Sequence, residues 1–184
     1  KETYVLLKGG NVTYAYGCGK GSGTTCTTTH VKIDGINGAD LTTVFGGGQA
    51  ASVTEKTNVV LLSGSVLNIF GGSNTLGEIP LSNVYVSDGT ATNVFGGNNE
   101  GGTTTLTNVK VGGGTVTNVY GGGEQATTET SNVLLFKGNV TSAFGGGHMA
   151  GVSTSNVKGY GGNVTNIFGG SNQNGTVTTS NVDI

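Results

Sequence analysis

The sequence is poor in charge and contains neither arginine nor tryptophan. Only 10% of its 184 residues are charged, the formal net charge is −2, and all eight basic residues are lysines. Proteins that bind nucleic acid usually present a basic stripe rich in arginine, so the composition argues against nucleic acid as a partner. No apolar run is long enough to span a bilayer, and we expect no membrane insertion.

Proline occurs once, whereas glycine occurs 37 times. Collagen needs glycine at every third position, and that period is absent. Valine, isoleucine and phenylalanine recur at regular places, which argues against a disordered chain. We therefore predict a single folded domain over residues 1–184. The chain opens at KETY without a leader, so we expect a mature or excised segment with other domains of the same secreted chain as neighbours.

Cysteine is scarce as well, because only Cys18 and Cys26 are present, both within the stretch GCGKGSGTTC. Two cysteines with no second pair do not make a zinc site, and we expect no metal or other cofactor. Their close spacing predicts a local disulfide, although two free thiols are the alternative. The disulfide and the low charge together favour a secreted or cell-surface protein.

What the sequence has in abundance is a repeat of 24 to 25 residues. An aromatic residue followed by a glycine run returns with this period after a longer first gap, and the valine of a T/S-N-V motif does the same. The aromatic positions are Tyr16, Phe45, Phe70, Phe95, Tyr120, Phe144 and Phe168.

Each repeat contains three strand-like pieces rich in valine, threonine and aromatics, exemplified by TNVKV, TVTNVY and TTTL, and none has a helical spacing of apolar residues. The pattern predicts an all-β, right-handed parallel β-helix with three short strands per turn and about seven turns. Equivalent residues would then lie above one another in columns. We expect a stack of aromatic rings, buried at a corner or exposed as a platform, and glycines with positive φ beside it.

Asparagine forms two further columns, and we expect their side-chain amides to hydrogen-bond from turn to turn. One contains the asparagine of each T/S-N-V motif, and the other precedes the aromatic by two residues. Their members are Asn58, Asn83, Asn108, Asn132, Asn156 and Asn181, and Asn68, Asn93, Asn118 and Asn166.

Two surfaces vary between repeats and are candidates for ligand binding. On the first, the outward side of the V-x-V strand, aromatic and basic residues alternate, although contact with a neighbouring domain is an alternative role. Its members are Tyr85, Lys110, Phe136, Lys158 and Tyr160. The second is a polar ridge just after the glycine bend. It includes Asn98, Asn99, Glu124, Gln125 and His148, together with Lys20, Gln49, Asn74, Glu100, Asn172 and Gln173.

Catalysis is not expected from this sequence. The ten acidic residues are scattered, no nucleophile motif is present, and neither His30 nor His148 has a sequence partner at metal or triad spacing. Glu100 and Glu124 fall on neighbouring turns and could face each other as a pair of acids. We expect instead that both are solvated surface carboxylates. A calcium site at Asp34 and Asp40 is a weaker hypothesis.

The unit V-x-V-x-G-G-x-V-T-N-V-F-G-G-G is clearest at residues 109–123, 133–147 and 157–171. It resembles glycine-rich β-helical repeats of secreted Firmicute surface proteins, and β-helical carbohydrate-binding modules attached to gut and rumen xylanases. The resemblance implies a non-catalytic module that holds an enzyme on plant polysaccharide such as xylan. An adhesin or stalk repeat is the alternative, and an ice-binding threonine face is a third.

Overall fold

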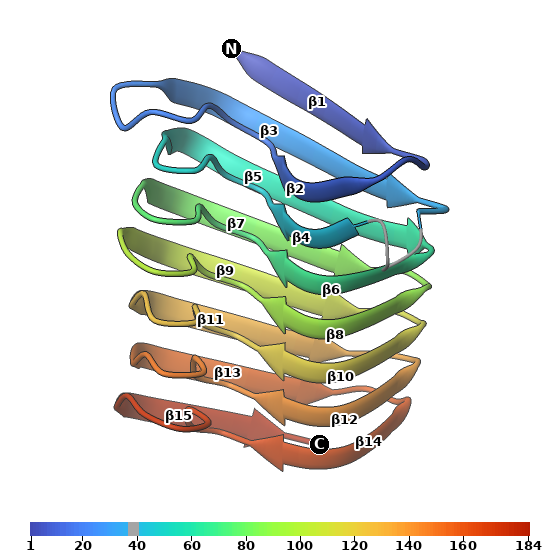
Figure 1. Cartoon of the computed structure of the whole chain (residues 1–184). Coiled ribbons are helices and arrows are strands. Elements are labelled where there is room, and N and C mark those ends of the chain that lie inside the picture. The colour runs from blue at the N-terminus through green and yellow to red at the C-terminus, as the bar shows by residue number, and fades with distance from the viewer. Residues whose placement is uncertain (37–40) are drawn as a thin grey trace.

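The strands pair only in parallel, and they stack into a β-solenoid of about seven turns (Figure 1). This computed structural model describes residues 1–36 and 41–184. Sheet A contains β1 (Glu2–Leu7), β3 (Thr25–Asp34), β5 (Ser52–Ser63), β7 (Glu78–Val86), β9 (Thr103–Val111), β11 (Thr128–Leu135), β13 (Val152–Gly159) and β15 (Val177–Asp183). Sheet B contains β2 (Val12–Tyr16), β4 (Leu41–Phe45), β6 (Ser65–Phe70), β8 (Thr90–Phe95), β10 (Thr115–Tyr120), β12 (Asn139–Phe144) and β14 (Asn163–Phe168).

A turn contains two strands and not the three expected from the sequence. The threonine-rich piece and the T/S-N-V piece form one continuous strand, as in β9, which includes both TTTL and TNVKV. The reason is that no glycine separates these two pieces, whereas glycines do separate both from the strand of sheet B. The predicted parallel β-helix and its period are confirmed. The described residues include no helix that could cross a membrane.

The T/S-N-V motif has a distinct role for each of its three residues. In β9, the Thr107 hydroxyl is buried and donates to the carbonyl of Gly121 at 2.6 Å. Asn108 is on the opposite side of the strand and donates to Asn83 at 3.0 Å. Val109 is fully buried between the sheets. The threonine or serine of the motif therefore bonds to the glycine corner, the asparagine forms the ladder, and the valine packs in the core. These three roles explain why the motif recurs.

The predicted asparagine ladder on sheet A is confirmed, because each amide donates to the asparagine of the turn before it at 2.9–3.2 Å. At the N-terminal end, Asn58 donates to the Thr29 carbonyl instead. The residue that replaces asparagine there is His30, whose ring stacks on Tyr4 with centroids 4.6 Å apart.

Two separate hydrophobic clusters stabilise the stack. The larger lies between the sheets and consists mainly of valine, isoleucine and leucine. The smaller is the aromatic column, in which Phe45, Phe70, Phe95, Tyr120 and Phe144 are buried. Neighbouring rings are nearly parallel, with interplanar angles of 3–11° and centroids 4.5–5.1 Å apart. The aromatic column is therefore buried, which is the first of the two alternatives predicted from the sequence. Offset stacking stabilises the folded state by about 1 kcal/mol for each pair of rings.

The glycine that follows each ring is needed for close approach and not for positive φ, so that expectation was wrong. Gly96 lacks a positive φ, but a Cβ there would overlap the carbonyl of Gly121 in the next turn. Positive φ occurs instead at bends such as Gly114, between the strands of sheet A and sheet B, where φ is 73°. Turns can thus pack at strand spacing because the corner carries no side chain.

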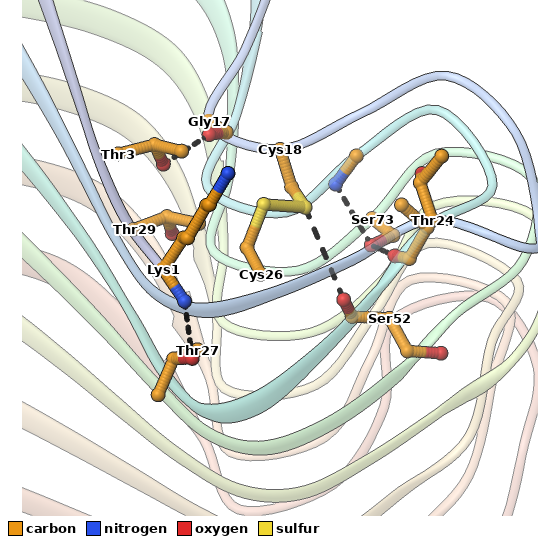
Figure 2. The surroundings of a disulfide bond; sticks show 12 residues. Lys1, Thr3, Gly17, Cys18, Thr24, Cys26, Thr27, Thr29, Ser52 and Ser73 are labelled. Carbon is orange, nitrogen blue, oxygen red and sulfur yellow. Dashed lines mark hydrogen bonds between the residues drawn. A yellow bond between two sulfur atoms is a disulfide. The ribbon is translucent and has the colours of Figure 1, made fainter.

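The predicted disulfide is present and cross-links two segments of the first turn. Cys18 and Cys26 are joined across a separation of eight residues, from the glycine-rich loop to β3. Figure 2 shows the bond beside Ser52 of the next turn, whose carbonyl lies 3.9 Å from the Cys18 sulfur. Cys26 also packs on Val53 and Ile79 in a small cluster beneath the loops. The bond therefore connects the N-terminal turn to a column that continues through the stack.

Candidate functional site

A groove of about 950 Å³ lies along the solenoid beside sheet B. Three columns of residues line it, so its long direction follows the stacking of the turns. One column comes from the strands of sheet B, one from the aromatic rings, and one from the loops that follow the glycine bends. We refer to this feature as the sheet B groove.

The aromatic column contributes the floor of the groove. The rings of this column that line it are those of Tyr16, Phe45, Phe70, Phe95 and Tyr120. Tyr14, which is 57% exposed, also lines the groove from outside the column. Because each ring stacks face to face on the next, ring faces are covered by neighbouring rings and the edges remain for the groove. Over this floor a ligand would therefore meet ring edges and the hydroxyls of Tyr16 and Tyr120, and the exposed Tyr14 ring lies at the N-terminal end of the groove.

The first wall is the asparagine ladder of sheet B. Asn118 donates to Asn93, and Asn93 donates to Asn68, both at 2.9 Å. Asn68 completes the ladder by donating to the Thr43 hydroxyl at 3.4 Å. Each ladder bond uses one of the two N–H groups of an amide and one lone pair of its oxygen. Every turn of this wall therefore retains a donor and an acceptor for a ligand. The remaining member of the predicted column, Asn166, donates to the Thr141 carbonyl instead.

The second wall is the polar ridge predicted from the sequence. Its lining residues follow the ring of their own turn by four positions and are Gln49, Asn74, Asn99, Glu124, His148 and Asn172. Glu100 also lines the groove. Several are held in place by one another or by the floor: Asn99 donates to Asn74 at 2.8 Å, and Asn172 donates to the Tyr120 hydroxyl at 3.1 Å. The wall is therefore preorganised without a ligand.

Both tyrosine hydroxyls in the floor have a pKa above the ordinary value of 10. For Tyr120 the main cause is burial, the hydrogen bond from Asn172 acts in the opposite direction, and the negative charge of Glu124 raises the pKa further. For Tyr16 burial again dominates, Asn74 lowers the pKa, and Glu100 is among the groups that raise it. Both hydroxyls are therefore neutral near pH 7 and can act as donors as well as acceptors.

The one acid–base contact in the groove joins Glu124 to His148 of the following turn. The Oε1 of Glu124 lies 2.6 Å from Nδ1 of His148, and both side chains are about one-fifth exposed. The His148 ring also tilts against Tyr120, with centroids 5.4 Å apart. His148, which had no partner in the sequence, thus gains one because the repeat places position 148 directly beyond position 124.

Four of the predicted ridge residues, Lys20, Asn98, Gln125 and Gln173, do not line the groove. Asn98 is completely buried, and its amide donates to the carbonyls of Gly77 and Gly101, so its role is to hold the loop. The prediction that Asn98 binds a ligand is therefore wrong. Gln125 is exposed but lies one position beyond the lining column. Asn99, Glu124 and His148 do line the groove, as the ridge hypothesis requires.

The other predicted surface is a stripe on the outer side of sheet A. Its rings contact one another and a lysine: the Lys110 ammonium lies 5.0 Å from the Tyr85 ring centroid and 4.7 Å from that of Phe136. Phe136 in turn stacks on Tyr160 at 4.7 Å. Lys110 thus occupies the space between the Tyr85 and Phe136 rings, whereas Tyr160 at the end of the stripe is 61% exposed. Lys158 is exposed beside this stripe.

No group of three or more histidine, cysteine, aspartate or glutamate side chains that could hold a metal ion occurs within residues 1–36 and 41–184. In the calcium hypothesis, Asp40 lies outside the described residues. Asp34 accepts a hydrogen bond from Ser63 and lies 3.8 Å from the Lys32 ammonium.

The threonines that suggested an ice-binding face do not form one ladder. Thr128 is in register with Thr104, and both are buried, whereas Thr103 and Thr105 are exposed. Thr103 is in register with Glu78, so the exposed column also contains a charged residue.

The chain matches no protein-family model, no curated protein and no solved structure.

Proposed function

We propose that this protein is a non-catalytic carbohydrate-binding module and that a β-1,4-linked glycan, such as xylan, lies along the sheet B groove. The observation that supports this most is the repetition of groove chemistry from turn to turn. Stacked rings are 4.5–5.0 Å apart in the floor, and one wall supplies an amide in each of three successive turns. This repeat is close to the length of one β-1,4-linked pyranose unit, so successive sugars meet equivalent groups.

The chemistry of the walls suits sugar hydroxyls. Asn68, Asn93 and Asn118 each present a donor and an acceptor beyond their ladder bonds, and a hydroxyl also donates and accepts. The amides are already fixed by neighbouring turns, so binding orders few side chains. With ring edges in place of ring faces, hydrogen bonds carry the recognition, and affinity is modest.

The groove is a better candidate than the stripe on sheet A, which the sequence placed first. There, the Lys110 ammonium occupies the space between the Tyr85 and Phe136 rings, so a sugar would have to displace it. A role for that stripe against a neighbouring domain fits its apolar character. The module would act outside the cell and hold an attached enzyme on plant polysaccharide, as the resemblance of the repeat implies.

The test is a titration of xylo- and manno-oligosaccharides into wild-type protein and three variants. Asn99→Ala removes a lining amide, Gln125→Ala removes an exposed amide beside the groove, and Tyr85→Ala alters the stripe on sheet A. We expect Asn99→Ala to weaken binding and the other two to bind as the wild type does. If Tyr85→Ala is the only one of the three variants that loses binding, the binding site lies on sheet A and not in the groove. Failure of the wild type to bind any glycan would favour the adhesin or stalk alternative.

A further inference from the structure

The charges of the molecule are unevenly placed around the sheet B groove. Two carboxylates line it, those of Glu100 and Glu124, whereas none of the eight lysines does so in the described structure. The only ionisable base in the lining is His148, and it is already in contact with Glu124. Four of the lysines, Lys32, Lys56, Lys110 and Lys158, lie instead on sheet A.

Glu100 is the carboxylate without a cation. Its side chain is exposed, and no ion pair to it occurs among the described residues, in contrast to Glu124. Its backbone N–H is bonded to the Asn74 carbonyl, which fixes its position in the wall. Burial is the main cause that raises the pKa of the Tyr16 hydroxyl, and the charge of Glu100 adds a smaller contribution in the same direction. The groove therefore has an unneutralised negative charge about midway along its length, in the turn of Phe95.

A polymer in the groove would pass this charge at close range. A sugar with a carboxylate would place like charges together, whereas a sugar with a protonated amine would form an ion pair with Glu100. We infer that the groove selects β-1,4-linked glycans by charge, preferring amino sugars to neutral sugars and neutral sugars to uronates, with Glu100 as the residue that determines the preference. This inference rests on the proposed function of the groove.

The expected difference in affinity between charged and neutral glycans follows from the exposure of Glu100. Solvent-exposed ion pairs contribute up to about 1 kcal/mol, which corresponds to about a fivefold difference in Kd at low salt. Salt at 1 M reduces the screening length to about 3 Å and should remove most of the difference. A preference that survives high salt would have a cause other than Glu100.

The experiment uses three hexasaccharides that share one β-1,4 linkage and one backbone, those of glucosamine, glucose and glucuronate. Titration is performed at about pH 5.5, so that the amines of the glucosamine hexamer and the carboxylates of the glucuronate hexamer are charged. We expect the glucosamine hexamer to bind about fivefold more tightly than the glucose hexamer, and the glucuronate hexamer to bind most weakly. In Glu100→Gln the three affinities should converge.

The matched control is Glu129→Gln, which removes an exposed carboxylate from sheet A, outside the groove. It changes the net charge equally, and it should keep the wild-type order of the three ligands. Equal affinities for all three in the wild type would overturn the charge preference while leaving the proposed function intact. The same order in Glu100→Gln would overturn the role of that residue. If none of the three hexamers binds, and xylo- and manno-oligosaccharides also fail, the proposed function itself is wrong.

Discussion

Val119 and Tyr120 are consecutive residues, both are buried, and they belong to two different hydrophobic clusters. Val119 packs between the two sheets and is 0% exposed, whereas Tyr120 is 3% exposed within the aromatic stack. Adjacent side chains of a strand point to opposite sides, so the stack lies across the strand from the valine core. This arrangement places the ring edges in the floor of the groove.

Phe95→Ala should lower the free energy of unfolding by about 3–5 kcal/mol, because it deletes a buried ring that stacks on two others. Phe168→Ala is the matched control in the same column. Phe168 is 46% exposed and stacks on Phe144 alone, so its loss should cost clearly less. Chemical denaturation measures both. Equal losses would show that the stack does not stabilise the fold as described.

Gly97→Ala should destabilise the protein by about 1–3 kcal/mol through overpacking. A Cβ at position 97 would lie 2.7 Å from the Thr128 hydroxyl oxygen and 2.9 Å from the Gly123 nitrogen of the next turn. Gly170 occupies the same place in the last turn, where nothing lies within 4 Å of a Cβ. Gly170→Ala should therefore change stability by less than about 0.5 kcal/mol. A comparable loss in both variants would argue against turn spacing as the cause.

Asn108→Ala should cost about 2 kcal/mol, since Asn108 donates to Asn83 and accepts from Asn132 at about 1 kcal/mol per bond. Asn181→Ala removes only the donation to Asn156 at the exposed end of the ladder and should cost about half as much. Thermal unfolding of the two variants gives the comparison. If Asn108→Ala is no less stable than the wild type, the ladder is not a source of stability.

Reduction of the disulfide should destabilise the first turn by about 2–3 kcal/mol, which is the chain-entropy expectation for so short a loop. In a solenoid each turn contacts only its neighbours, so the effect should fade along the stack. Amide hydrogen exchange with and without reductant should show faster exchange in β1 and β3 than in β11 and β13. The variant Cys18→Ser/Cys26→Ser should not respond to reductant. Uniformly faster exchange would contradict local coupling.

Alkaline pH should destabilise the protein in part through Tyr120. Burial raises the pKa of its hydroxyl above 10 in the folded state, so the folded chain retains a proton that the unfolded chain loses. Stability is therefore fully present below pH 10 and falls as the pH rises through the higher folded-state value. Urea denaturation as a function of pH should show a shallower fall in Tyr120→Phe, and a shallower one still when Tyr16→Phe is added. An unchanged slope in the double variant would contradict this source.

The columns of the solenoid could be predicted from the sequence, since the period alone places Asn83 beside Asn108 and Phe95 beside Tyr120. The number of strands per turn was predicted wrongly, although a signal was present: no glycine separates TTTL from TNVKV. The ridge wall of the groove was also predictable, because loops that vary on a fixed frame are exposed.

The rest of the groove could not be predicted, because it depends on which side of a strand each residue faces. Asn98 and Asn99 are neighbours of the same type, yet only Asn99 lines the groove while Asn98 bonds to the loop backbone. Likewise, nothing in the local sequence shows that the Asn118 column and the ridge face one another. That relationship arises only when the glycine bend returns the chain past the aromatic ring.

If one sugar unit matches one turn of the sheet B groove, the affinity for xylo-oligosaccharides must depend on their length. Calorimetric titration from the disaccharide to the octasaccharide gives the affinity for each length. Because five stacked rings and six ridge positions line the groove, affinity should rise with each added unit and level off at about five or six. The same series on Asn99→Ala should show a lower plateau. An affinity that does not change beyond the disaccharide would contradict the account.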